Sequence, residues 1–239
     1  MISGFMNVTG NMASGLHFSG VANITGQSFG GLMASGLLNV VGEHMNGLQI
    51  AGIANITASK LNGVQVALCN YATKARGLQI GLVNYYKEDM KGFQLGLVNA
   101  NPDTKVQMMV YGGNATPANI GVRFKNQLFY TILGVGSMYQ GLNDKFSASA
   151  SYRAGLSFPL YKGLSISGDL GYQHIEAFDN KDEVIPKRLY ALQARANLEY
   201  QFTKKFGIFA TGGYGVTRFY NKSSNYDKGA IIEAGIVLF

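Results

Sequence analysis

GLQIGLVNYYKEDMKGFQLGLVN, residues 77–99, contains nearly the same eight residues twice, from Gly77 to Asn84 and from Gly92 to Asn99. A unit that recurs at a fixed period is the signature of a stacked repeat architecture. Further copies precede this stretch back to Asn7, with a period of 14 to 16 residues. Each full copy opens on a glycine and closes on an asparagine, and the closing residues are Asn23, Asn39, Asn55, Asn70, Asn84 and Asn99.

The connections between copies favour parallel stacking. Each closing asparagine is followed by the next opening glycine seven or eight residues later, whereas the connections of an antiparallel membrane barrel alternate between short and long. We therefore predict a β-solenoid over residues 1–101, in which the closing asparagines form a ladder. Extra strands of a larger barrel are the alternative.

The faces of one copy follow from its alternation. In the copy that opens at Gly77, Leu78 and Ile80 share one face and Gln79 points to the other, so we expect the Gln positions to be exposed. The first three full copies have nine residues and the last three have eight. We expect the extra residue to form a bulge within a strand. Residues 85–91 are predicted to be the most charged turn, where function would be sought.

The composition excludes several classes of protein. Charged residues make up 14% of the chain, against about 25% in soluble domains, and no apolar run reaches the roughly 18 residues of a membrane helix. A helical membrane protein is thereby excluded, whereas a β-barrel is compatible with these values. The net charge of +7 is scattered along the chain, so we expect no nucleic-acid partner.

The single cysteine, Cys69, excludes an internal disulfide and a four-thiolate metal site. It occupies the position that Val83 has in the next copy, so we expect a small buried side chain. We predict neither a cofactor nor a metal. The first residues match the middle of a repeat and lack a signal-peptide pattern, so we expect a fragment, a processed form or a misassigned start.

Residues 102–239 predict an eight-stranded antiparallel transmembrane β-barrel. From Leu189 to Phe202, apolar residues alternate with polar or charged ones, and strands of about 11 to 15 residues can cross an outer membrane when tilted. Longer loops are expected at 140–145, 177–186 and 221–226. The strands are expected near 105–112, 117–125, 127–139, 146–159, 162–176, 187–202, 204–219 and 227–239.

Charged residues of both signs fall on the predicted inner face of this barrel. An eight-stranded barrel is just wide enough for side chains to fill it, so we expect an ion-pair network in preference to a conduction pathway. Its members are Arg123, Arg153, Asp169, Arg195, Glu199 and Glu233. Aromatic residues near strand ends or on outward faces are expected to form membrane-interface girdles: Tyr130, Tyr139, Tyr172, Tyr200, Phe202, Tyr214 and Tyr220.

The GLQxGLxN copies resemble surface-repeat proteins of Gram-negative bacteria, and the C-terminal part resembles small OmpA- or OmpX-like barrels. The terminal Phe239, on an alternating last strand, resembles the signal that the outer-membrane barrel assembly machinery reads. These resemblances imply a bacterial outer-membrane location, with membrane lipid and that machinery as partners. A further partner in the envelope or at the cell surface would bind the repeats. The repeat resemblance supplies no catalytic residues.

Two alternatives to a structural or interaction role remain open from the sequence: a lipid-modifying enzyme and a larger barrel that acts as a channel. His174 has Glu176 and Asp179 nearby, as a general base would need. The candidate nucleophiles Ser165 and Ser167 lie roughly 25 Å away along the strand, at about 3.3 Å per residue. We therefore expect a protein that is not an enzyme.

Overall fold

The computed structural model describes residues 1–139, 142, 146–178 and 188–239, and it divides into two units, Met1–Asp103 and Thr104–Phe239. Both are built from β-strands, and within the described residues no helix has the length and apolarity to cross a membrane. The strands of the first unit are β1 (Ile2–Ser3), β2 (Met6–Thr9), β3 (Ala13–Ser19), β4 (Ala22–Thr25), β5 (Phe29–Ser35), β6 (Leu38–Val41), β7 (His44–Ala51), β8 (Ala54–Val66), β9 (Cys69–Ile80), β10 (Val83–Leu95) and β11 (Val98–Ala100).

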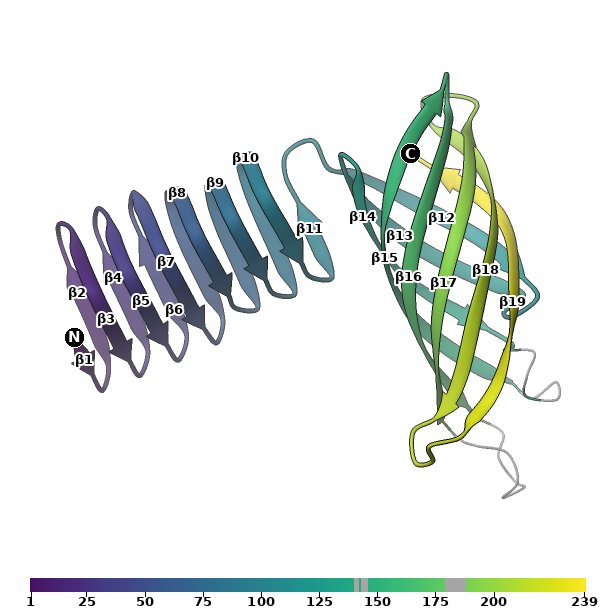
Figure 1. Ribbon diagram of the computed structural model, residues 1–239, viewed down its shortest axis with the longest axis horizontal. Coiled ribbons are helices and arrows are strands. Elements are labelled where there is room, and N and C mark those ends of the chain that lie inside the picture. Colours follow the sequence, from purple (N-terminus) through teal and green to yellow (C-terminus); the bar gives the residue numbers. More distant parts are fainter. Residues whose placement is uncertain (140–141, 143–145, 179–187) are drawn as a thin grey trace. The chain divides into compact units, whose positions relative to one another are not determined.

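The first unit is a parallel β-solenoid, as the sequence predicts. Every strand pair in it is parallel, and equivalent residues of successive copies lie in register, such as Gly47 with Gly63 and Asn39 with Asn55. Figure 1 shows the coils stacked side by side, each with two strand segments. The alternative in which the repeats enlarge the barrel is wrong, because the barrel closes without them.

The opening glycines are required by this stacking. Gly63 and Gly77 have φ values of 144° and 131°, which other residues rarely adopt. A Cβ atom on Gly77 would lie 2.0 Å from the carbonyl oxygen of Gly63 in the coil before it. Glycine is therefore the residue that lets successive coils approach to strand-pairing distance at this point.

The faces of the repeat strands are the reverse of our expectation. The Gln positions point into the solenoid, where Gln65 and Gln79 are fully buried, whereas the alternating leucine positions lie on the outside, as in Leu16 and Leu95. A second apolar set fills the interior beside the Gln side chains: Phe29, Met33, Val41, Met45, Leu61, Ala72 and Ala75.

Two further details of the repeat differ from prediction. The extra residue of the longer copies forms no bulge inside a strand, because each copy turns a corner between its glycine and its asparagine. Ile50 pairs with Val66 and Ala54 with Cys69, so the extra residue lies in the corner. The predicted turn at 85–91 lies within β10, which has only a register irregularity between Tyr86 and Asp89.

The second unit is a closed barrel of eight antiparallel strands, as predicted. Neighbouring strands pair in sequence order, and β12 pairs with β19 to complete the ring (Figure 1). The strands are β12 (Lys105–Gly113), β13 (Ala118–Asn126), β14 (Phe129–Ser137), β15 (Ser147–Tyr161), β16 (Leu164–Ala177), β17 (Arg188–Gln201), β18 (Phe206–Phe219) and β19 (Asn225–Leu238). Most of the expected loops at 140–145 and 177–186 lie outside the described residues.

The barrel wall alternates between an apolar exterior and a polar interior. Leu170 is 72% exposed on the outside, whereas the neighbouring Asp169 is buried. The expectation of aromatic girdles is wrong for Tyr130 and Tyr139, because both side chains are buried. The other five aromatic residues are exposed. Apolar clusters also occupy the interior, one around Tyr130, Ile132 and Phe209 and another around Tyr139, Ile175 and Leu189.

Candidate functional site

The lumen of the barrel contains all six charged residues that alternation predicts there, and all six are buried. Arg123 on β13 donates hydrogen bonds of 2.6 and 3.0 Å to the two carboxylate oxygens of Glu199 on β17. These two strands are four positions apart in a ring of eight. The pair therefore spans the lumen from one wall to the opposite wall.

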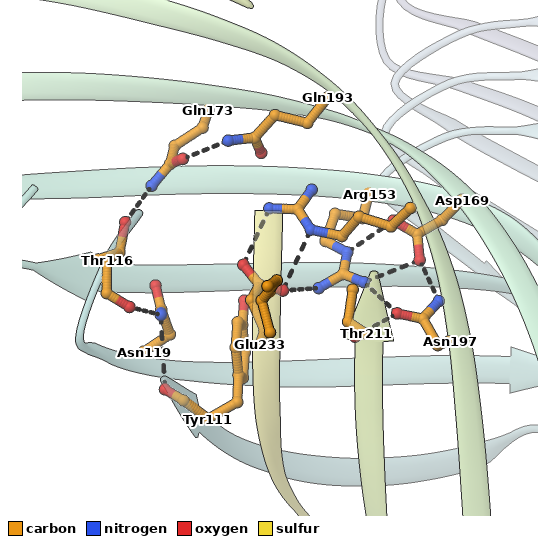
Figure 2. Close-up of polar contacts among 12 residues, drawn as sticks. Tyr111, Thr116, Asn119, Arg153, Asp169, Gln173, Gln193, Asn197, Thr211 and Glu233 are labelled. Atoms are coloured by element: carbon orange, nitrogen blue, oxygen red, sulfur yellow. Dashed lines mark hydrogen bonds and ion pairs between the residues drawn. The ribbon is translucent and has the colours of Figure 1, made fainter. Parts of the chain in front are cut away.

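The other four charged residues form one chain of alternating sign, of which Figure 2 labels Arg153, Asp169 and Glu233. Arg153 on β15 makes two hydrogen bonds of 2.8 Å to Asp169 on β16. The Nη1 of Arg153 lies 3.5 Å from a carboxylate oxygen of Glu233 on β19. The two carboxylate oxygens of Glu233 each accept a bond of 3.1 Å from Arg195 on β17. Because β15 and β19 are also opposite each other in the ring, this chain is a second bridge across the lumen.

Neutral groups that the sequence analysis missed complete the network. The hydroxyl of Tyr130 and the amide of Asn197 each donate a 2.8 Å bond to Asp169, and Gln107 accepts from Arg123 at 2.6 Å. Farther along, Gln193 donates to Gln173 at 3.0 Å. The signal that could have found Gln107, Gln173, Gln193 and Asn197 is their place on the same inward parity as the charges.

This arrangement fills space and balances charge. Three arginines face three carboxylates, and each is held by at least one partner. Bidentate arginine–carboxylate pairs fix geometry strongly. Within the described residues, no group of His, Cys, Asp or Glu has an arrangement that could hold a metal ion. The lumen as it stands has the properties of a packed, cross-braced core.

The closing asparagines of the solenoid form a continuous buried ladder. The side chains of Asn7, Asn23, Asn39, Asn55, Asn70 and Asn84 each donate a bond of 2.9 to 3.1 Å to the asparagine of the next coil, which ends the series at Asn99. Each of these amides also donates to a backbone carbonyl beside the corner, for example Asn55 to Val66 at 3.0 Å. The ladder thus satisfies the carbonyls next to the corner.

A second ladder, which the sequence analysis placed on the surface, lies inside. Gln65 donates to Gln49 at 2.9 Å, Gln79 to Gln65 at 2.8 Å, and Gln94 to Gln79 at 2.9 Å. His17 occupies the same position in the first full coil, and burial lowers the pKa of its imidazole. The available signal was the Gln that recurs at this position in the last four copies, Gln49, Gln65, Gln79 and Gln94, between apolar residues that vary.

His174 lies on the outer face of the barrel, where its ring bonds to Tyr220 at 2.7 Å and Glu176 at 3.3 Å. The candidate nucleophile Ser167 points into the lumen, where it is buried and accepts a bond from Asn197. Ser165 shares the inward parity of Ser167. The third residue of the proposed group, Asp179, lies outside the described residues. The described serines and His174 therefore do not meet.

Phe239 and Cys69, the last two residues with a stated expectation, differ in how exposed they are. Phe239 packs against the interior cluster at its end of the barrel, and its backbone N–H donates to Lys205 at 3.0 Å. Cys69, expected to be buried, is exposed. This expectation is wrong because Val83, the residue that aligns with Cys69, is itself on the outside of the solenoid.

Comparisons with known proteins give structural matches to the barrel. No family model matches the chain, and no curated protein matches its sequence. The N-terminal β-barrel domain of Pseudomonas aeruginosa OprF is similar at 17% identity and a TM-score of 0.41, covering 56% of this chain and 95% of that domain. Neisserial surface protein A is similar at 9% identity and a TM-score of 0.35, covering 56% of this chain and 93% of that chain.

Proposed function

We propose that the chain is a bacterial outer-membrane protein whose barrel is a closed anchor and whose β-solenoid offers an extended surface to a partner. The observation that carries this proposal is the cross-braced lumen, in which Arg123–Glu199 and Arg153–Glu233 join opposite walls. A barrel braced in this way serves as a rigid mount, and its function then lies in what it holds.

The exterior of the barrel supports its place in a membrane. Large apolar side chains project outward from strands around the ring, including Val106, Ile120, Leu156, Leu170, Leu192 and Ile232. Water would penalise such a band, whereas lipid solvates it. An antiparallel closed sheet also leaves no strand edge unpaired, as the hydrocarbon core requires.

The non-enzymatic role is part of the same proposal. The lumen carboxylates are held by arginines, so each lacks the freedom to transfer a proton that general acid–base catalysis needs. The ring of His174 bonds to Tyr220 and Glu176 on the outer face, and neither Ser165 nor Ser167 is among its bonded partners. We further propose that Phe239 and the last strand are read by the barrel assembly machinery.

Conductance measurements test the closed anchor. The full chain is reconstituted into vesicles, its insertion is verified by flotation, and the same preparation is fused with a planar bilayer. We expect no single-channel steps above the lipid background. Steady unitary currents from the floated protein would contradict the proposal and favour a channel.

A further inference from the structure

We propose that one long edge of the solenoid inserts into a single leaflet of a lipid membrane. This apolar edge is the row of corner residues that follows the first strand segment of each coil, namely Phe5, Val21, Leu37, Ile53, Leu68, Leu82 and Leu97. Except for Val21, which is half-buried, these side chains are 38% to 64% exposed. A mainly aliphatic row along the full length of a domain marks a surface that contacts another protein or a membrane.

Apolar side chains continue from the apolar edge along both outer faces of the coils. On one face the next two outward rows contain residues such as Phe18, Ile50 and Leu95, then Leu16 and Phe93. From Leu16 to the corner at Val21 is five residues, or about 16 Å at about 3.3 Å per residue. This depth matches half of the roughly 30 Å hydrocarbon core, so it suits one leaflet and is too short to span both.

The charges of the coils lie toward the opposite edge. We name this edge the polar edge. It comprises the turns at residues 10–12, 26–28 and 42–44 and the equivalent positions 58–60, 73–74 and 87–89, which lie within β8, β9 and β10. They contain Glu43, Lys60, Lys74, Lys87, Glu88 and Asp89, and Arg76 and Lys91 lie in the adjoining outward row. Between the two edges, Tyr71 and Tyr85 stack with ring centroids 5.8 Å apart. Tyrosines at this level suit a membrane–water interface.

Backbone groups along the apolar edge bond from one coil to the next. Leu37 donates its N–H to Val21 at 3.0 Å, Ile53 to Leu37 at 3.0 Å, and Leu82 to Leu68 at 2.8 Å. The carbonyls of the preceding row accept from the asparagine ladder, as at Ile50 and Ile80. Internal satisfaction of backbone groups is the condition for entering hydrocarbon.

These features favour lipid over protein as the occupant. A protein interface forms about one hydrogen bond per 100–200 Å² and is rich in aromatic residues and arginine. This row is mainly aliphatic, and backbone groups along it already bond to neighbouring coils. A convex corner also offers a second copy little flat area. This argument rests on the proposed membrane location of the barrel, to which the solenoid is tethered by residues 101–104 between β11 and β12.

Spin-label accessibility tests the insertion in the full chain, reconstituted into vesicles of phosphatidylethanolamine and phosphatidylglycerol. The native Cys69, exposed and directly after Leu68, is the label site. We expect Cys69 to be accessible to oxygen and shielded from a water-soluble nickel complex. A label at Ala58→Cys on the polar edge, in a Cys69→Ser background, is expected to be accessible to nickel.

Edge variants make the test specific. The triple variant Leu37→Lys, Ile53→Lys, Leu82→Lys is expected to move the Cys69 label into the nickel-accessible state. The matched control places three lysines on the polar edge, at Gln27, Glu43 and His44, and is expected to leave the label unchanged. Hydrogen exchange across the repeats checks that both variants keep the solenoid folded. If the triple variant unfolds, the three lysine substitutions are tested one at a time.

The outcomes that contradict insertion of the solenoid edge differ from those that contradict the membrane location of the barrel. A second Cys69→Ser background carries Leu170→Cys on the outer barrel wall as a lipid reference. If that label is lipid-exposed while Cys69 is as accessible to nickel as Ala58→Cys, the insertion is wrong and the anchor stands. Spin–spin broadening at Cys69 would instead indicate a second copy on the edge, and it would also overturn the proposal. A nickel-accessible label at Leu170→Cys would contradict the anchor itself.

Discussion

The solenoid and the barrel both bury amide side chains, but among the described residues the buried arginines and carboxylates all lie in the barrel. The solenoid interior contains amides, in the Asn and Gln ladders, whereas the barrel lumen contains three arginines and three carboxylates. In a solenoid, the neighbour of each side chain is its own copy in the next coil. An amide is both donor and acceptor and can bond to a copy of itself, whereas a charge would repel its copy.

In the barrel, the neighbours are different residues from different strands. Arg123 meets Glu199 and Arg153 meets Asp169, so opposite charges can pair. The geometry of each unit thus favours a different interior. Stacked identical coils favour side chains that can bond to copies of themselves, whereas a closed barrel brings together different residues and so permits pairs of opposite charge.

The largest effect is expected from placing a charge in the asparagine ladder. Asn55→Asp keeps the shape but removes donors to Gln49, Val66 and Asn70. Buried carboxyls must take up a proton at a cost of about 4 kcal/mol at neutral pH, and the lost donors add about 1–3 kcal/mol. The cost should fall as the pH falls, because protonation removes the charge.

Hydrogen exchange of the repeat segments in the full chain measures this change. The matched control is Asn62→Asp, whose amide bonds to Asn46 at 2.8 Å in the same stacked manner but on the exposed face. We expect the control to cost less than about 1 kcal/mol. Equal losses at the two positions would mean that burial of the ladder is not what excludes charge.

The next effect concerns the barrel. Arg153→Met removes the only arginine paired with Asp169 among the described residues and leaves Glu233 with Arg195 alone. Breaking a buried pair in this way costs about 3–5 kcal/mol. The exposed pair Arg188–Glu176 provides the control, because Arg188→Met should cost less than about 1 kcal/mol. Urea unfolding of the two variants in matched micelles gives the comparison, and similar midpoints would contradict a structural lumen network.

A smaller effect is expected from the stacking glycines. Gly77→Ala places a Cβ against the Gly63 carbonyl oxygen, 2.0 Å away, at a positive φ. Backbone strain alone costs about 1–3 kcal/mol. Gly15→Ala also has a positive φ but meets nothing within 4 Å. Local hydrogen exchange should therefore show a greater loss at Gly77, and equal losses would assign the effect to φ alone.

The smallest effect is a pH dependence at His17, the ionisable member of the Gln position. Burial lowers its pKa in the folded state, so protonation favours unfolding. Stability is fully present above the unfolded-state value of about 6.5 and decreases as the pH falls below it. His17→Gln should remove this decrease in the first coils, as measured by hydrogen exchange at several pH values. An unchanged profile would exclude His17 as its source.

The sequence predicts the fold where its pattern has one physical meaning. The period from Gly15 to Asn99 specifies stacked parallel coils, and strict alternation in β17 places Arg195 and Glu199 in the lumen. Alternation does not say which face of a repeat strand is inside. We expected Gln79 outside because amides are usually exposed, but a ladder satisfies each amide with its copy. Partners across the lumen, such as Arg123 and Glu199, depend on barrel closure and are not encoded locally.

A charge swap across the lumen tests the central claim most directly. Arg123→Glu and Glu199→Arg are each expected to destabilise the barrel by about 3–5 kcal/mol, since each leaves like charges facing one another. Combined, they restore an opposite pair across the same diameter, and the cycle should show a favourable coupling of about 1–3 kcal/mol in urea unfolding. Additive losses in the double variant would contradict a barrel braced by cross-lumen ion pairs.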